Sequence, residues 1–261
     1  MNLGLNGKNA IVCGSTQGIG KCIALGLAEM GASVTLIARN ENKLKEVVQE
    51  LDTTSGQQHQ YLAADFSNFD EVKEKVADYM SNNYVHILIN NTGGPAGGPI
   101  TDATIEAFHA AFNMHLVCNH ILAQAVVPSM KEAGFGRIIN VVSTSIKQPL
   151  SGLGVSNTTR GAVASWAKTM SNELAPFNIT VNNVLPGATN TVRLKSIIEA
   201  KAAKAGVDKE KISEHMRAEV PMNRFAEPEE VANVACFLAS PAAGYVTGVS
   251  IPVDGGRTSC L

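Results

Sequence analysis

Residues 9–20 read N-A-I-V-C-G-S-T-Q-G-I-G, a short apolar run from Asn9 to Cys13 followed at once by a glycine-rich turn. The run is typical of a buried strand, and the residues beyond the turn have helical spacing. Glycines there let the backbone bend tightly and approach a pyrophosphate, which then rests on the helix N-terminus. This context favours a dinucleotide site. The residues predicted to contact the dinucleotide are Gly14, Ser15, Thr16, Gln17, Gly18, Ile19 and Gly20.

The same alternation of strand and helix continues along the chain. Predicted strands are Asn9–Cys13, Ser33–Ala38, Gln60–Ala64, His86–Asn90, Arg137–Val142, Thr180–Leu185 and Val249–Val253. Predicted helices are Ile19–Met30, Glu41–Leu51, Asp70–Met80, Ile105–Lys131 and Pro228–Leu238. Continuous apolar strands separated by helices indicate an α/β fold, a doubly wound, Rossmann-type parallel sheet with helices on both faces. We expect a single domain over residues 1–261.

Composition narrows the class of protein. The 261 residues are 45% hydrophobic, enough for one large core, and the net charge of −2 gives no footprint for nucleic acid. No uninterrupted apolar run approaches the roughly 18–20 residues that span a bilayer, so no membrane partner is expected. Five scattered cysteines, without metal-ligand spacing, predict reduced thiols, a cytoplasmic location and no metal site.

The end of the second predicted strand distinguishes NADP from NAD. Ala38-Arg39-Asn40 lies roughly 20 residues past the glycine turn, where such folds place the side chain that reads the ribose. A carboxylate there would bind the ribose hydroxyls of NAD, whereas Arg39 supplies a planar cation suited to a 2′-phosphate. NADP is therefore favoured, with NAD as the alternative if Arg39 is a solvated cation near Glu41.

Residues Thr191–Pro221 depart from the regular alternation. This stretch is rich in Ala and Lys, is helical in pattern, and precedes the helix at Pro228–Leu238. Inserted helices beyond the carboxyl end of a strand often cover a ligand crevice, so we interpret residues 191–221 as a substrate lid. The alternative is a solvated helical hairpin with no contact to substrate.

Further motifs follow the other strands. They are Ala64-Asp65-Phe66, Asn90-Asn91-Thr92-Gly93-Gly94, Pro186-Gly187 with Thr189 and Thr191, Arg224–Ala232, and Val246-Thr247-Gly248 through Gly256. Together with the glycine turn they resemble, in order and over nearly the full length, the short-chain dehydrogenase/reductase superfamily, in particular its 3-oxoacyl-ACP-reductase-like members. Several independent motifs in the right order make the resemblance specific.

This resemblance implies an NADP(H)-dependent oxidoreductase that acts on a small-molecule substrate and assembles as a homotetramer or homodimer. It implies that Asp65, with Phe66, contacts the adenine ring. The other residues implied to hold the cofactor are Asn91, Thr92, Gly93, Pro186, Gly187, Thr189 and Thr191.

The catalytic set of the resembled family, Asn, Ser, Tyr and Lys, is mostly missing. The Asn position falls on His115, and Ser143 matches the family's Ser. The Tyr-x-x-x-Lys motif is replaced by S-N-T-T-R, which puts Ser156 and Arg160 at the positions of the acid and its lysine. The chain has four tyrosines, none of them in the segment after Ser143.

The missing tyrosine removes the usual proton donor. A positioned general acid is worth on the order of 10²–10⁴ in rate, and a serine hydroxyl is far less acidic than a phenol. Arg160 keeps a positive charge one helical turn from Ser156 but cannot relay protons, because it stays charged. His115 is the alternative acid, since its free pKa of about 6.5 suits proton transfer, unless it is an inert buried histidine.

Three functions therefore remain open. The favoured one is a carbonyl reductase or alcohol dehydrogenase with an atypical proton donor, in which Ser143 bonds the substrate oxygen. The second is a non-catalytic nucleotide-binding or scaffolding protein. The third is a non-redox isomerase or lyase that uses His115 as base.

Overall fold

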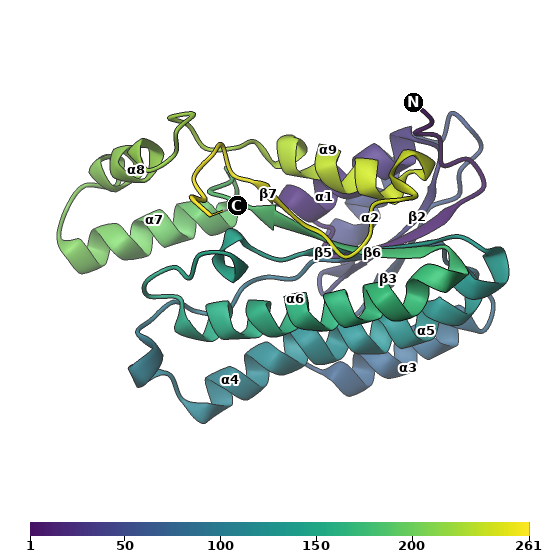
Figure 1. Ribbon diagram of the computed structural model, residues 1–261, viewed down its shortest axis with the longest axis horizontal. Helices are drawn as coiled ribbons and strands as arrows, with labels where there is room; N and C mark the ends of the chain where they lie inside the picture. Colours follow the sequence, from purple (N-terminus) through teal and green to yellow (C-terminus); the bar gives the residue numbers. More distant parts are fainter. Residues whose placement is uncertain (261) are drawn as a thin grey trace.

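A computed structural model of the chain describes residues 1–260, and its centre is one parallel sheet (Figure 1). The strands are β1 (Asn9–Cys13), β2 (Ser33–Ala38), β3 (Gln60–Ala63), β4 (Ile87–Asn90), β5 (Gly136–Val141), β6 (Ile179–Pro186) and β7 (Ser250–Val253). They lie in the order β3-β2-β1-β4-β5-β6-β7, and every neighbouring pair is parallel. The order reverses direction between β1 and β4, where doubly wound sheets bind their ligands.

Helices cover both faces of this sheet (Figure 1). One layer consists of α1 (Gly18–Glu29), α2 (Glu41–Glu50) and α9 (Pro228–Ala239). The other consists of α3 (Phe69–Met80), α4 (Ile105–Phe112), α5 (Cys118–Ala133) and α6 (Gly154–Leu174). Every residue of β4 and β5 is buried, because each strand is covered from above and below. The predicted fold class is confirmed, and the strand bounds differ from the prediction by about one residue at an end.

The predicted single helix Ile105–Lys131 is wrong in one respect. A π-helical segment, Asn113–Val117, interrupts it between α4 and α5. Such bulges insert an extra residue into a turn and are frequent at functional sites. Periodicity alone does not reveal the bulge, because the apolar pattern continues across it.

The same helical run, Ile105–Ala133, is 29 residues long and by length and composition could cross a membrane, although polar residues interrupt its apolar sequence. Core helices pass the same test. In this fold the run packs against α3 on one side and α6 on the other.

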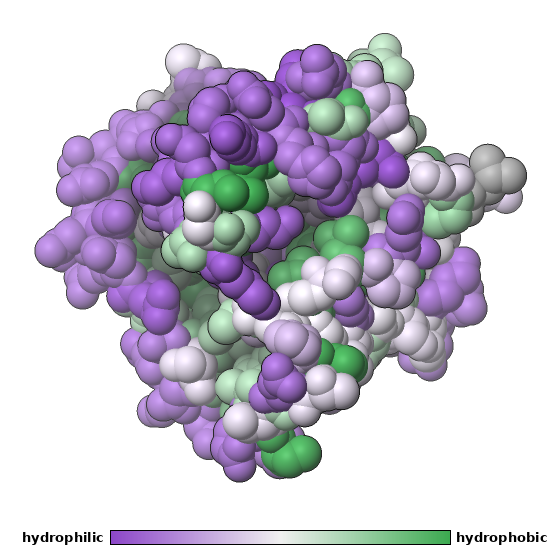
Figure 2. All heavy atoms as spheres, turned by 90° about the vertical axis from the view of Figure 1, so that its left-hand side faces the viewer, coloured by the Kyte–Doolittle hydropathy of each residue, from purple (hydrophilic) through white to green (hydrophobic). Residues whose placement is uncertain are grey.

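The segment predicted as a lid contains two helices, α7 (Val192–Ala205) and α8 (Lys209–Ala218), which pack against each other. They project beyond the carboxyl ends of the strands, at the left in Figure 1. Figure 2 faces this end and shows a hollowed surface, with apolar residues exposed inside a rim of hydrophilic ones. The hairpin therefore lies where a lid would, and its role in substrate binding stays a prediction.

Candidate active site

The glycine turn after β1 is a tight cradle. Gly14 and Gly18 have φ of 58° and 56°, in the left-handed region that favours glycine. A β-carbon on Gly20 would collide with the Gly14 carbonyl oxygen and with the side-chain amide of Asn91. That amide donates to the carbonyl oxygens of Cys13 and Gly14, each at 3.2 Å. Only glycine fits these positions, and the backbone stays open to a ligand.

The N-terminus of α1 is suited to an anion. Gln17 is the N-cap, and within residues 1–260 its side chain makes no capping hydrogen bond; the first turn holds no acidic residue. Ser15 is buried, Thr16 and Ile19 are half-buried, and Gln17 is exposed. The amide groups of the first turn and the helix dipole therefore remain available to a phosphate. The cradle and the open helix end fit a dinucleotide.

Arg39 follows the last residue of β2 at the same edge of the sheet. Its side chain is exposed and forms no ion pair within residues 1–260, whereas Glu41 pairs with Lys45 at 2.9 Å. Glu41, the carboxylate that could have paired with Arg39, therefore pairs with Lys45 instead. Asp65 lies past the end of neighbouring β3, where Oδ1 accepts from the Ser67 amide at 2.9 Å, and Phe66 beside it is buried.

The segment after β6 returns to the glycine turn. Thr191 is the N-cap of α7, and a β-carbon on Gly18 would lie 3.2 Å from its methyl carbon. Asn91 contacts Gly14 from the segment after β4, while Gly93 is exposed. The fold thus brings the predicted residues that follow β1, β4 and β6 to one crevice.

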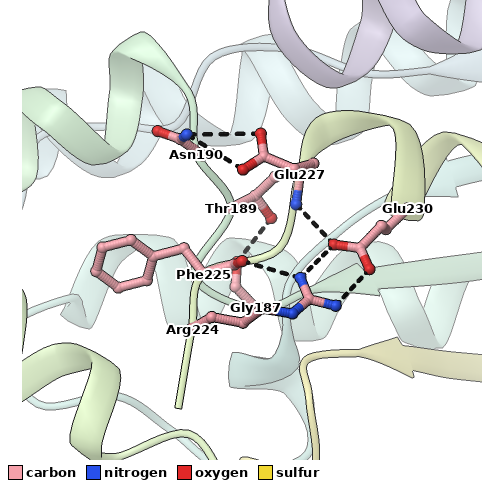
Figure 3. A network of polar contacts seen from close by, with 7 residues as sticks. All are labelled: Gly187, Thr189, Asn190, Arg224, Phe225, Glu227 and Glu230. Atoms are coloured by element: carbon pink, nitrogen blue, oxygen red, sulfur yellow. Dashed lines mark hydrogen bonds and ion pairs between the residues drawn. The ribbon is translucent and has the colours of Figure 1, made fainter. Parts of the chain in front are cut away.

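A polar network fixes the Pro186–Thr191 segment against α9 (Figure 3). Thr189 donates to the Gly187 carbonyl oxygen at 3.1 Å, and the Asn190 amide nitrogen donates to Glu227 Oε1 at 3.3 Å. Arg224 forms a two-pronged ion pair with Glu230, each contact 2.6 Å long. The motif around Arg224 matched the resembled family without an assigned role; here its Glu227 contacts the loop predicted to hold the cofactor, and Glu230, paired with Arg224, accepts from the Glu227 amide.

The π-helical segment places His115 in a buried polar cluster. His115 Nδ1 and Thr92 Oγ1 are hydrogen-bonded at 2.6 Å, and Nε2 has no partner among residues 1–260. Burial, and then the charge of Arg160, lowers the pKa of His115 to about 3. The imidazole is therefore neutral at physiological pH. Of the two alternatives left open by the sequence, a proton donor or an inert buried histidine, the burial and the lowered pKa favour the second.

Arg160 lies on α6 and is also buried. Its Nη1 donates to the Val141 carbonyl oxygen at the end of β5, at 3.0 Å. Burial, followed by the charge of Arg193, lowers the pKa of Arg160 to about 10. The guanidinium therefore stays charged at neutral pH inside the protein.

The two serines lie close in sequence to the groups that hold this charge: Ser143 is two residues after Val141, and Ser156 is one helical turn before Arg160. Ser143 follows β5 and caps a short 3₁₀ turn, accepting from the Ser145 amide at 3.1 Å. Ser156 is half-buried in the first turn of α6. The next two residues, Asn157 and Thr158, line a pocket of about 670 Å³ with Pro99, Ile100, residues 149–152 and Gly154. Ser156 itself does not line this pocket, which opens beside the first turn of α6.

No tyrosine hydroxyl reaches this cluster from the described part of the chain. Tyr79 on α3 bonds Thr35 at 2.7 Å, and Tyr61 donates to Glu41 at 3.3 Å. Tyr84 and Tyr245 are exposed. Residues 1–260 also contain no cluster of three or more His, Cys, Asp or Glu that could hold a metal ion.

Arg193, which the sequence assigned only to the lid, also lies at the candidate active site. Arg193, in the first turn of α7, donates from Nη2 to the Pro95 carbonyl oxygen at 2.6 Å. Its position two residues after Thr191, a predicted cofactor-binding residue, was the only signal in the sequence that Arg193 lies near the site. The approach of α7 to α6 is a result of the fold.

Comparison with known proteins agrees with this architecture. The family whose sequence model matches residues 14–258 is described as enoyl-(acyl carrier protein) reductase. The chain is 32% identical over 258 residues to the NADPH-dependent reductase BacG of Bacillus subtilis, covering 97% of this chain and 99% of that protein. It is 33% identical over 258 residues to 7alpha-hydroxysteroid dehydrogenase of Escherichia coli, covering 98% and 96%.

Solved structures give the same result. L-sorbose reductase from Gluconobacter frateurii, complexed with NADPH and L-sorbose, superposes with a TM-score of 0.93 at 33% identity over 100% of both chains. An actinorhodin polyketide ketoreductase with NADPH superposes with a TM-score of 0.89 at 30% identity, covering 97% of this chain and 98% of the other. From its motifs, its sheet and these likenesses, the chain belongs to the short-chain dehydrogenase/reductase superfamily.

Proposed function

We propose that this protein is an NADP(H)-dependent oxidoreductase that reduces a carbonyl or oxidises an alcohol with a proton donor other than tyrosine. The oxidoreductase class and the NADP(H) cofactor predicted from the sequence are confirmed by relatives that are NADPH-dependent reductases and dehydrogenases. The cofactor, when bound, supplies or accepts the hydride. The observation that carries the proposal is the buried, charged Arg160, one helical turn from Ser156 and hydrogen-bonded to the Val141 carbonyl oxygen two residues before Ser143.

The nucleotide half of the crevice has separate tasks for separate residues. The amides at the start of α1 bind the pyrophosphate, with Gly14, Gly18 and Gly20 keeping the backbone accessible. Arg39 binds the 2′-phosphate, and Thr189 and Thr191 hold the nicotinamide end. The test is a fluorescence titration with NADPH and NADH. In Arg39→Gln we expect NADPH affinity to fall roughly 10-fold, as for one lost charged hydrogen bond, with NADH affinity unchanged.

At the reactive end, Ser143 donates a hydrogen bond to the substrate oxygen. Arg160 stabilises the negative charge that develops on that oxygen, since a buried positive charge acts strongly where water is excluded. The proton then comes from a water molecule held by the Ser156 hydroxyl, in the volume that the shorter side chain leaves open, and the hydroxide that remains takes a proton from bulk solvent. Arg160 itself gives no proton at neutral pH, because its pKa of about 10 keeps it charged.

His115 acts here as a positioning residue that orients Thr92 through their 2.6 Å hydrogen bond. With a pKa of about 3 it is neither a proton donor nor an effective base at pH 7. This weakens the non-redox alternative, which required His115 as base.

The deciding experiment measures NADPH oxidation with a panel of aldehydes, diketones and oxo-esters. We expect turnover in the wild type and a loss on the order of 10²–10³ in kcat for Ser143→Ala, the cost of one lost donor to the developing charge. Ser165→Ala, an exposed serine on α6, is the matched control and should keep full activity. If no substrate is turned over while NADPH binds, the non-catalytic nucleotide-binding alternative is correct.

We also propose a homotetramer or homodimer in the cytoplasm, with α7 and α8 closing over substrate. The apolar helical run Ile105–Ala133 is only partly buried within one chain, which suits a contact with a second copy. Light scattering gives the assembly size. Slower proteolysis of residues 191–221 in the presence of NADP⁺ and substrate would support the lid, and an unchanged rate would contradict it.

A further inference from the structure

Two arginines from different helices converge on Gly94. A β-carbon placed on Gly94 would lie 3.6 Å from Arg193 Nη2 and 3.9 Å from Arg160 Nη2. Arg160 comes from α6 and Arg193 from α7, and the charge of Arg193 contributes, after burial, to the lowered pKa of Arg160. Because Gly94 lacks a side chain, the space between the two guanidinium groups is left free of a β-carbon.

Neither guanidinium has an acidic partner among residues 1–260. Arg160 donates to the Val141 carbonyl oxygen and Arg193 to the Pro95 carbonyl oxygen, which leaves further N–H donors on both. Three other arginines have carboxylate partners: the pairs are Arg217–Glu210, Arg224–Glu230 and Arg257–Glu219. Arg39 has none within residues 1–260, but its side chain is exposed to water. Arg137, also buried, is compensated differently, by the carbonyl oxygens of Gly136, Asn178 and Ser240. Among the described residues, Arg160 and Arg193 are thus two guanidinium groups that converge without a carboxylate, one of them buried.

Placing two like charges together, one of them buried, is unfavourable unless an anion compensates them. His115 adds an independent sign of an incomplete site, since its buried Nε2 lacks a partner in the described chain. Guanidinium groups bind carboxylates through two parallel hydrogen bonds, a geometry that suits two arginines converging on one group.

Resting on the function proposed above, we propose that Arg160 and Arg193 bind a carboxylate of the substrate, so that the preferred substrates are oxo acids with the carboxylate beside the reacting carbonyl. Arg160 lies one helical turn from Ser156, which puts the anion close to the reacting oxygen. The segment from Gly94 to Ile100 runs from the arginine pair to the pocket of about 670 Å³, which would hold the rest of the substrate.

The other source of an anion is the cofactor. Its phosphates already have the α1 N-terminus and Arg39, whereas the arginine pair lies with Thr92 and His115 at the reactive end of the crevice. We therefore assign the pair to substrate, and the experiment separates the two sources.

The test is calorimetric titration of protein saturated with NADP⁺, which binds probes without turning them over. The probes are a series of 2-oxo acids of increasing chain length, each compared with its ethyl ester. We expect at least one acid to bind roughly 10- to 100-fold more tightly than its ester, the range for a charged hydrogen bond. Arg193→Gln should bring that ratio close to one, and Arg193→Lys should retain part of it.

Lys131→Gln on α5 is the control, because Lys131 lies outside the lid and the crevice, over the ring of Phe177, and it should leave the ratio unchanged. If no acid binds more tightly than its ester, the proposal is overturned. It is equally overturned if Arg193→Gln weakens NADPH binding instead, or if inorganic phosphate displaces NADPH but not the acid, since the pair would then serve the cofactor. Charge-selective binding without NADPH oxidation would instead contradict the proposed oxidoreductase function and leave this subsite standing.

Discussion

The two halves of the crevice are held together by different forces. The nucleotide half, around Gly14 and Gly20, depends on backbone geometry and on the absence of side chains. The reactive half, around His115 and Arg160, depends on buried polar and charged side chains. The nucleotide half tolerates few substitutions, because a β-carbon on Gly14 or Gly20 would collide with the backbone. In the reactive half, a single substitution can change the chemistry while the sheet beneath stays the same.

The largest effect should come from the charge of the reactive half. Arg160→Gln should lower kcat on the order of 10²–10³, because the developing negative charge loses its buried partner, while NADPH affinity changes far less. Steady-state kinetics and a fluorescence titration measure the two quantities separately. An equal loss in both would mean that Arg160 serves the nucleotide half.

The pH dependence of kcat also tests the role of the Arg160 charge. With a pKa of about 10, Arg160 is charged below that pH and neutral above it. Wild-type kcat should therefore stay constant between about pH 7 and 9 and fall as pH rises through 10. Arg160→Gln should lack this alkaline decline.

The next largest effect should be on NADPH affinity, from a substitution in the nucleotide half. Gly20→Ala should weaken NADPH binding by roughly 100-fold, because its β-carbon forces apart the Gly14 carbonyl and Asn91. Gly161→Ala is the matched control, since a β-carbon there meets open space on α6. Tight NADPH binding by Gly20→Ala would show that the cradle adapts to a side chain and that the nucleotide half is not intolerant of substitution.

A smaller effect concerns the stability of the reactive half. His115 has a folded pKa of about 3, below its unfolded value, so the unfolded state gains a proton first as pH falls. Wild-type stability should decrease by about 2 kcal/mol between pH 7 and pH 5 from this group alone. His115→Asn should lose less over that range, as measured by urea unfolding. His109→Asn, at an exposed site on α4, should behave as wild type.

The smallest effect should come from the ion pair that orients the Pro186–Thr191 loop. Arg224 and Glu230 are partly exposed, and such pairs contribute little in water. Glu230→Gln should weaken NADPH binding only a few-fold, roughly 2- to 5-fold, with the effect reduced further at high salt. A loss as large as that of Gly20→Ala would mean that this loop, rather than the glycine cradle, dominates nucleotide binding.

The sequence predicted the fold to within about a residue at most strand ends, because β4 and β5 are apolar along their whole length and need no distant information to be recognised. The nucleotide half was also readable, since Gly14 to Gly20 are contiguous and their spacing carries the geometry. The π-helical segment at Asn113–Val117 was not, because the apolar period continues through it.

By itself, then, the sequence determined the α/β class, the glycine cradle, the cation at Arg39 and the absence of a Tyr-x-x-x-Lys motif. Only the tertiary structure decided that His115 is neutral and that Arg160 and Arg193 meet at Gly94. The reason is physical: local backbone preferences act between neighbours along the chain, whereas burial and electrostatics act between residues that only folding brings together.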